Sequence, residues 1–256
     1  MIAENENEWP RITFDYHDVR VLVTGATSGI GEGIARAYVR AGAHVTVTGT
    51  RAEASAYEKD LSMFDYRQLR VEDAGQIEAL AASLPQLDIL VNNAGAVFPG
   101  GKTEDDPDVF EQAVRINLFG AYRLAHACRA KLARSRLTGG ASVVGIASMT
   151  SFFGNETVPG YGAAKAALVQ LTKTLAIAWA SDGIRANAVA AGLIESGMTA
   201  EMIAADAHHA FVARTPLARI GTPHDVAGVV LFLTSPAAAY VTGQTWAADG
   251  GYSIRG

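Results

Sequence analysis

The chain has 256 residues, is 49% hydrophobic and 18% charged, and carries a formal net charge of -5. This length and composition fit one large α/β domain with a sizeable core. The acidic balance, without any Lys/Arg run, argues against a nucleic-acid or anionic-membrane partner. The one cysteine, Cys128, excludes an intramolecular disulfide framework and fits a reducing compartment. Its helical setting predicts an inert packing residue.

Residues 1–18 are predicted to form a polar N-terminal extension to a single domain that covers 19–256. Met1 to Trp9 is polar and acidic and lacks the basic and apolar regions of a signal peptide. The best apolar run, Val226 to Leu233, is much shorter than the roughly 20 residues that span a bilayer. We therefore expect a soluble, cytoplasmic protein without a membrane partner.

Strand-like and helix-like patterns alternate along the chain. Strands are predicted at 20–23, 44–48, 68–71, 88–91, 141–148, 185–189 and 245–248, and helices at 33–41, 73–84, 109–132 and 161–181. Asp73 is the expected N-cap of the second helix. Continuous apolar strands joined by helices predict a parallel sheet that is covered on both faces. Such sheets bind ligands at the carboxyl ends of their strands.

A glycine-rich turn, Thr24 to Gly31, directly follows the first strand and opens the first helix. Small residues let the backbone approach a diphosphate, and the helix N-terminus offers free N–H groups and a positive dipole end. A plain strand-to-helix turn is the alternative. The strand before, the helix after and the second strand beyond favour a dinucleotide site.

The end of the second strand bears on the choice of cofactor. An acidic side chain there binds the ribose hydroxyls of NAD and repels the 2′-phosphate of NADP. Here the sequence is Thr48-Gly49-Thr50-Arg51, without a carboxylate. Thr50 can donate a hydrogen bond and Arg51 can pair with a phosphate, unless Arg51 is an ordinary solvated arginine. NADP(H) is favoured, and NAD(H) stays open.

Tyr161 and Lys165 lie one turn apart in an Ala-rich helical segment, so both side chains should project from one face. Ser148 precedes them at the end of a predicted strand. A phenol can give or take a proton, a neighbouring ammonium favours its phenolate, and a hydroxyl can hold a carbonyl oxygen. The three residues predict a proton-transfer site.

Five further motifs accompany these residues, and with them the chain resembles the short-chain dehydrogenase/reductase family. They are Asn92 to Gly95, Ile116 to Gly120, Ala191-Gly192, Asp249 to Gly251 and the glycine turn, spread over about Val21 to Tyr252. The resemblance implies a Rossmann-like, doubly wound fold with a seven-stranded parallel sheet. It also implies NAD(P)-dependent oxidation of alcohols or reduction of carbonyls. A homotetramer or homodimer is implied as well, with the helices at 109–132 and 161–181 forming an interface.

The resemblance also assigns roles to individual positions. Tyr161 becomes the acid in reduction and the base in oxidation, Lys165 lowers its pKa and holds the nicotinamide ribose, Ser148 polarises the substrate oxygen, and Asn117 binds a water in the proton relay. The backbone of Ile194 and the side chain of Ser196 are expected to hold the carboxamide. The complete expected cofactor set is Gly25, Thr27, Ser28, Gly29, Ile30, Gly31, Thr50, Arg51, Val71, Asn93, Ala94, Gly95, Tyr161, Lys165, Gly192, Ile194 and Ser196.

Two positions depart from the family pattern. Arg70 stands where the family often has an aspartate that touches adenine, so that contact is open, although arginine can stack on a base. Ala191 replaces the proline of the family's Pro-Gly pair, which is expected to loosen the following loop without removing a chemical group.

The resemblance further implies that the substrate, a small-molecule alcohol or ketone, lies beside three regions that line the pocket in this family. These regions supply Val97 and Phe98, Phe152 and Phe153, and Met198, Met202 and Phe211. The same side chains fit ordinary packing, but as pocket residues they indicate a fairly apolar substrate. His208-His209 lacks partners at metal-ligand spacing, so no metal is expected. Alternatives to a carbonyl reductase or alcohol dehydrogenase are a non-catalytic nucleotide-binding sensor and an isomerase or dehydratase on the same scaffold.

Overall fold

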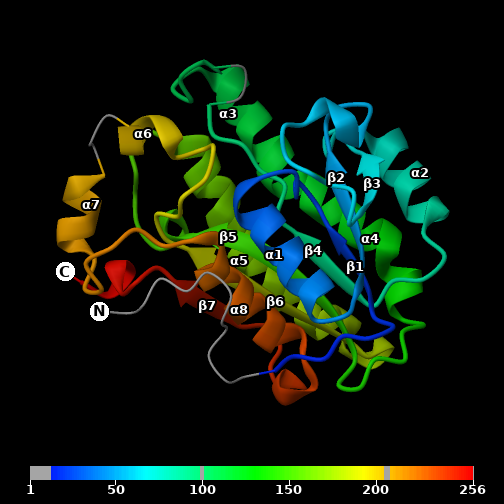
Figure 1. The fold of residues 1–256 in the computed structure, drawn as a ribbon. Coiled ribbons are helices and arrows are strands. Elements are labelled where there is room, and N and C mark those ends of the chain that lie inside the picture. Colours follow the sequence, from blue (N-terminus) through cyan, green and yellow to red (C-terminus); the bar gives the residue numbers. More distant parts are fainter. Residues whose placement is uncertain (1–12, 99–100, 205–207, 256) are drawn as a thin grey trace.

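The computed structural model describes residues 13–98, 101–204 and 208–255, apart from the side chains of Glu201 and Met202. They form a seven-stranded, all-parallel sheet with strand order β3-β2-β1-β4-β5-β6-β7 (Figure 1). The strands are β1 Arg20–Val23, β2 His44–Gly49, β3 Asp65–Gln68, β4 Ile89–Asn92, β5 Ala141–Ser148, β6 Ile184–Ala191 and β7 Thr245–Ala248. The predicted Rossmann-like α/β class is confirmed.

Helices cover both faces of this sheet. The α-helices are α1 Gly29–Arg40, α2 Ala74–Ser83, α3 Pro107–Val114, α4 Gly120–Leu132, α5 Pro159–Trp179, α6 Ala200–Ala204, α7 His209–Arg214 and α8 Pro223–Thr234. Helices α1 and α8 pack together on one face, and α2, α4 and α5 lie on the other (Figure 1). None of the helices in the described part of the chain is long and apolar enough to cross a membrane.

The two cores follow from the alternation of side chains along each strand. In β1, Val21 and Val23 enter the core beneath α1 and α8, whereas Leu22 enters the core beneath α2, α4 and α5. In β4, Leu90 joins Leu22 in that second core. Because both faces are buried, these strands read in the sequence as continuous apolar runs.

Several predicted boundaries were wrong. The third strand was expected at 68–71 but is Asp65–Gln68; Leu69 and Val71 are buried because they pack under α2, and not because they belong to a strand. Helix α1 starts at Gly29, before the apolar pattern becomes visible. The expected helix 109–132 is divided by a π-helical segment, Arg115–Phe119. Asp73 is confirmed as the α2 N-cap, since its side chain accepts from Gln76 N.

The described end of the expected N-terminal extension packs on the domain. Tyr16 is buried, its ring meets that of Tyr38 edge to face, and its hydroxyl donates to the Leu231 carbonyl at 2.5 Å. Thr234 lies within hydrogen-bond distance of both tyrosine hydroxyls. Residues 13–18 therefore fasten α1 to α8, and residues 1–12 lie outside the described structure.

The strand order reverses between β1 and β4, which are direct neighbours in the sheet. Connections leave these two strands in opposite directions, so a crevice opens at their carboxyl ends. The glycine turn after β1 and Asn93 after β4 both lie at this edge. The fold thus places the expected cofactor motifs where such a sheet binds ligands.

Candidate active site

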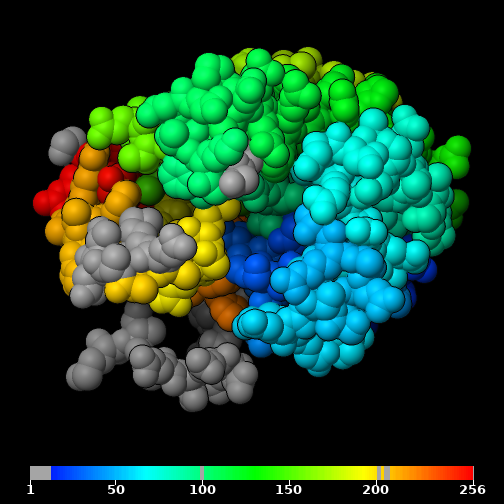
Figure 2. Space-filling view, turned by 90° about the horizontal axis from the view of Figure 1, so that it is seen from above, coloured from blue at the N-terminus to red at the C-terminus, as the bar shows by residue number. Residues whose placement is uncertain are grey.

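A cleft of about 460 Å³ opens at the carboxyl ends of the central strands. Figure 2 shows the hollow, with the blue first turn at its bottom between cyan, green and yellow surfaces. It contains most of the predicted cofactor residues: Gly25, Ser28, Gly29, Ile30, Gly31, Thr50, Val71, Asn93, Ala94, Gly95, Tyr161, Lys165, Gly192, Ile194 and Ser196. Residues far apart in the sequence therefore line one cleft.

The floor of the cleft needs glycine at three positions. Gly25 and Gly29 have φ of +61° and +56°, in the left-handed region that side chains disfavour. A Cβ at Gly31 would press on the Asn93 side-chain amide and lie 2.6 Å from the Gly25 carbonyl oxygen. Ser28 makes no side-chain cap for α1, which leaves the first-turn N–H groups open to an anion. This cradle fits the diphosphate of a dinucleotide.

Thr24 and Asn93 hold the turn against β4. The Thr24 hydroxyl accepts from the backbone N–H groups of Asn93 and Ala94, each at 3.0 Å. The Asn93 amide donates to the carbonyls of Thr24 and Gly25 at 2.9 and 3.0 Å. The two motifs therefore support each other, and Asn93 shapes the floor of the cleft through the turn.

Two predicted cofactor residues do not line the cleft. Thr27 packs its methyl group toward Gly49. The Arg51 guanidinium lies over the Tyr57 ring, 4.9 Å from its centroid, and donates to the Ala56 carbonyl. At the cleft itself the lining includes Thr50, which follows β2, and Arg70, where the chain departs from the family pattern.

The proposed catalytic groups meet at the inner end of the cleft. Ser148 ends β5, and its hydroxyl forms a hydrogen bond with Tyr161 and accepts one from the Thr150 hydroxyl at 3.0 Å. Lys165 Nζ lies 5.4 Å from the Tyr161 ring centroid and donates to the Ile146 carbonyl at 2.7 Å. Both α5 side chains face the cleft, as their spacing predicts.

Burial sets the proton affinities of this pair. Burial raises the pKa of Tyr161, the hydrogen bond from Ser148 lowers it, and the Glu104 carboxylate raises it. Burial also lowers the pKa of Lys165 to about 8. Lys165 donates to the Ile146 carbonyl and lies beside the Tyr161 ring, and the expected lowering of the Tyr161 pKa by its ammonium stays a prediction.

Asn117 lies in the π-helical segment, directly behind Gly95. Its amide donates to the carbonyls of Ala96 and Ala113 at 2.7 and 2.9 Å. A Cβ on Gly95 would come within 2.5 Å of Asn117 Oδ1 and 3.4 Å of Lys165 Nζ. The segment thus brings Asn117 next to Lys165 and the cofactor cleft, and a π-bulge at this point is typical of functional sites.

The predicted substrate residues divide into two groups. Met198 lines the catalytic cleft, and Phe98 and Phe152 are exposed. Phe153 and Phe211 instead pack against Tyr252, with ring centroids 5.6 Å apart in each pair, and belong to a structural cluster. The side chain of Met202 lies outside the described structure.

Sequence reasoning missed three polar residues at this site. Thr48 Oγ1 accepts from Gly25 N at 3.2 Å, and Thr199 Oγ1 donates to the Ile194 carbonyl at 2.7 Å. Glu104 is 1% exposed and accepts from Tyr161 N at 2.8 Å. Nothing in the sequence marks these contacts. Glu104 opens the acidic run Glu104-Asp105-Asp106, which has the pattern of a solvated loop and gives no signal of burial.

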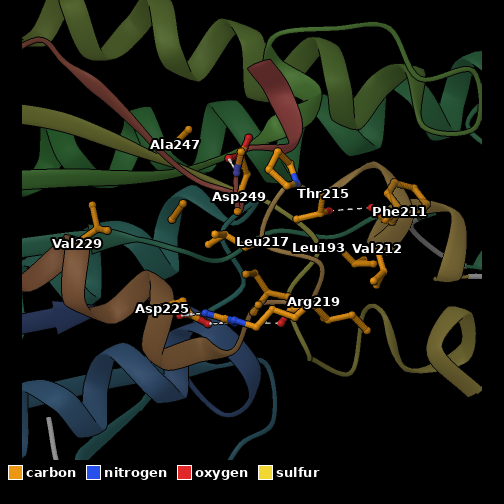
Figure 3. Close-up of a pocket in the computed structure, with 17 residues that line it drawn as sticks. Leu193, Phe211, Val212, Thr215, Leu217, Arg219, Asp225, Val229, Ala247 and Asp249 are labelled. Atoms are coloured by element: carbon orange, nitrogen blue, oxygen red, sulfur yellow. Dashed lines mark hydrogen bonds and ion pairs between the residues drawn. The ribbon is translucent and has the colours of Figure 1, made fainter. Parts of the chain in front are cut away.

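A second cavity of about 500 Å³ lies beside α7 and α8 and shares Ile194 with the cleft (Figure 3). Its lining is mainly apolar, with Leu193, Val212 and Leu217 among its residues. Its charged pair is satisfied internally, since Arg219 donates to both Asp225 oxygens at 2.7 and 2.8 Å. The predicted catalytic residues Ser148, Tyr161 and Lys165 line the first cleft and not this cavity.

The remaining candidate groups for chemistry are metal-ligating side chains and the cysteine. Within residues 13–98, 101–204 and 208–255, no group of His, Cys, Asp and Glu side chains has the arrangement of a metal site. Cys128 is buried, and burial raises its pKa to about 12, so its thiol stays protonated and is a packing residue as predicted.

The chain is similar to known proteins over most of its length. A family model described as enoyl-(acyl carrier protein) reductase matches residues 25–253. A tropinone reductase homologue of Arabidopsis thaliana is 36% identical, with 92% of this chain and 93% of that protein covered. Galactitol 2-dehydrogenase (L-tagatose-forming) of Cereibacter sphaeroides is 35% identical, with 95% and 98% covered.

A solved structure extends the match to three dimensions. A protein from Agrobacterium tumefaciens, provisionally described as 2-deoxy-D-gluconate 3-dehydrogenase and solved with bound NADP, is similar with a TM-score of 0.81 and 34% identity over 95% and 99% of the two chains. The fold and site define an NAD(P)-dependent oxidoreductase of alcohol and carbonyl groups. The chain belongs to the short-chain dehydrogenase/reductase family.

Proposed function

We propose that this protein is an NADP(H)-dependent oxidoreductase that interconverts a carbonyl and a secondary alcohol of a fairly apolar small molecule. The convergence of Ser148, Tyr161 and Lys165 at the inner end of the dinucleotide cleft carries the proposal. Met198 and the exposed rings of Phe98 and Phe152, from the regions expected beside the substrate, support an apolar substrate.

Each catalytic side chain has a distinct task. The Ser148 hydroxyl holds the substrate oxygen next to the phenol. Tyr161 gives its proton to that oxygen in reduction and removes one from the alcohol in oxidation. The Lys165 ammonium stabilises the phenolate left behind, and Asn117 orders the route by which the proton is replaced. A bound nicotinamide supplies the hydride, so these residues supply position, a proton and an electrostatic field.

The cofactor proposal rests on the residues around the adenosine end of the cleft. Thr50 and Arg51 directly follow β2, where an NAD-specific site carries a carboxylate. Arg70 lines the cleft, and Arg51 would reach a 2′-phosphate by leaving the Tyr57 ring. We expect a higher kcat/KM with NADPH than with NADH, and a smaller ratio in Arg51→Gln and Arg70→Gln. A preference for NADH in the wild type contradicts this choice.

Tyr161→Phe tests the reaction itself. A phenylalanine fills the same space but has no proton to transfer, so turnover should fall by about 10²–10⁴-fold while NADPH binding stays unchanged. Tyr240→Phe is the control, because Tyr240 is a fully exposed tyrosine that does not line the cleft. Full turnover by Tyr161→Phe in a cofactor-coupled screen of ketones and secondary alcohols refutes the role. Binding of NADPH without turnover by the wild type favours a sensor.

A second candidate substrate class is a polyol or sugar acid. The galactitol dehydrogenase and the solved NADP complex described above support it, since both carry names for this kind of substrate. The same screen distinguishes the two classes when it includes hexitols and aldonic acids beside apolar ketones. A kcat/KM at least tenfold higher for the polyols selects this second candidate.

We also propose a homodimer or homotetramer. The α4–α5 side exposes Phe119, Tyr122 and Ile177, and the Ile177 side chain is 83% exposed. Burial of such side chains between two copies would remove apolar surface from water. Ile177→Glu should then lower the mass measured by light scattering, and a monomeric wild type refutes the proposal.

A further inference from the structure

Glu104 is a buried carboxylate in the segment between β4 and α3. It is 1% exposed, which is rare for a carboxylate without compensating contacts. Oε1 accepts from Phe98 N at 3.1 Å and Oε2 accepts from Tyr161 N at 2.8 Å. None of the ion pairs among residues 13–98, 101–204 and 208–255 includes it. Backbone N–H groups are therefore its partners.

The first of these contacts fastens the loop that follows the cofactor-binding Gly95. Phe98 has a φ of +48°, a conformation that non-glycine residues seldom adopt. Such a residue keeps its conformation only where its surroundings fix it. The hydrogen bond to Glu104 Oε1 provides this restraint, and so holds Phe98 on the side of the site where the substrate is expected.

The second contact fastens the helix that carries the catalytic pair. Helix α5 begins at Pro159, and Val158 gives it no side-chain cap. Tyr161 N is one of the first-turn donors that the helix itself leaves unpaired. Glu104 supplies the missing acceptor from another part of the chain, and an anion is favoured at a helix N-terminus.

We propose that Glu104 is a positioning residue, which fixes Tyr161 through the first turn of α5 and joins it to the Phe98 loop. The inference rests on the proposed reaction. Glu104 does not itself line the cleft, so it acts through Tyr161 rather than on the substrate. One carboxylate thereby connects the Phe98 loop, which follows Gly95, with the acid–base residue Tyr161.

The charge of Glu104 also bears on proton transfer. Ser148 from β5 and Lys165 from α5 lie beside the Tyr161 phenol, whereas the Glu104 carboxylate acts on it electrostatically from its place at the Tyr161 backbone N–H. A nearby anion disfavours the phenolate, which is the direction found for Glu104. Removal of the charge should lower the Tyr161 pKa and move the acid limb of alcohol oxidation toward lower pH.

Glu104→Gln is the test, because the amide has almost the same shape but no charge and only one acceptor oxygen. We expect kcat to fall about tenfold or more as Tyr161 is displaced. The Kd for NADPH should stay within about twofold, and the acid limb of the kcat/KM profile for oxidation should shift to lower pH. Asp105→Asn, at the exposed neighbour, should behave as the wild type in all three measurements.

Amide hydrogen exchange gives a readout that does not depend on turnover. The Tyr161 amide should exchange faster in Glu104→Gln than in the wild type and in Asp105→Asn. If no substrate is turned over although NADPH binds, the proposed function fails, and exchange still decides the role of Glu104. Unchanged exchange refutes it. A variant with lower thermal stability but an unchanged pH profile and kcat also refutes it, as does failure of both Glu104→Gln and Glu104→Asp to fold.

Discussion

Lys165→Met is expected to stabilise the cofactor-free protein while it abolishes the function of the site. The Lys165 side chain is 3% exposed, and among the described residues the one hydrogen bond of its ammonium goes to the Ile146 carbonyl. No carboxylate within the described ranges forms an ion pair with it. A buried charge with so little compensation lowers the free energy of unfolding.

The magnitude follows from the pKa of the lysine. Burial lowers it from 10.5 to about 8, which corresponds to a cost of about 3 kcal/mol for keeping the ammonium folded at neutral pH. Methionine has a similar length and no charge, but it loses the hydrogen bond to Ile146, worth about 1 kcal/mol. We therefore expect a net gain of about 2 kcal/mol at pH 7.

The pH dependence gives the sharper test. Below pH 8 both the folded and the unfolded wild type carry the proton, so the full cost is present. Between pH 8 and 10.5 the folded lysine has lost its proton while the unfolded lysine keeps it, and the wild type therefore gains stability as the pH rises. The advantage of Lys165→Met should shrink across this window.

Urea unfolding at pH 7 and at pH 10 measures both effects. Lys173→Met is the matched control, because Lys173 is an exposed lysine of the same helix. It should change the unfolding free energy by less than about 0.5 kcal/mol at either pH. Saturating NADPH should stabilise the wild type more than Lys165→Met. A variant that is less stable at pH 7, or a gain that does not depend on pH, refutes the reasoning.

Two further predictions concern the cofactor turn and the α8 N-terminus. In Gly31→Ala the added methyl group would collide with Asn93, at a cost in folding free energy of about 1–3 kcal/mol, and NADPH binding in a fluorescence titration should weaken tenfold or more. Gly75→Ala is the control: its added Cβ has its nearest atom at 3.4 Å, so this variant should bind NADPH normally. Equal affinities contradict the cradle. Hydrogen bonds from Arg219 lower the pKa of Asp225 to about 2, so the stability that this carboxylate adds is present above pH 4 and is lost as the pH falls toward 2. Asp225→Asn should destabilise by about 1 kcal/mol at pH 7 in urea unfolding, a modest value because the pair is partly exposed, and the difference should narrow at pH 3.

The sheet and its order of elements could be predicted because both faces of each central strand are buried. Continuous apolar runs such as Ile89–Val91 mark these strands without ambiguity. The same pattern led to a wrong strand prediction at Leu69 and Val71, because these residues are apolar for packing under α2 and not for a place in the sheet. The apolar pattern did not indicate the π-helical segment Arg115–Phe119, because a helix with one wider turn keeps nearly the same spacing of apolar residues.

The candidate site was predictable where chemistry requires a residue type at a fixed spacing. Glycines at positive φ and a tyrosine one turn before a lysine can be recognised in the sequence. Contacts between distant segments cannot. The position of Arg51 on the Tyr57 ring depends on a loop whose path the sequence does not specify. From the sequence, Glu104 looks like an ordinary solvated loop residue. It is buried because two backbone N–H groups from distant segments donate to its carboxylate.

Glu104 and Lys165 together explain why the site keeps two buried charges apart. A direct ion pair would compensate both, but it would turn the ammonium away from Tyr161 and from a bound nucleotide. Instead each charge is compensated by the backbone: Glu104 by N–H groups and Lys165 by the Ile146 carbonyl. Since a backbone carbonyl is a weaker partner than a carboxylate, Lys165 can exchange it for cofactor hydroxyls and the phenolate. The weak hydrogen-bond partner of Lys165 therefore has two effects: it lowers the stability of the folded protein, and it leaves the ammonium charge available to the reaction.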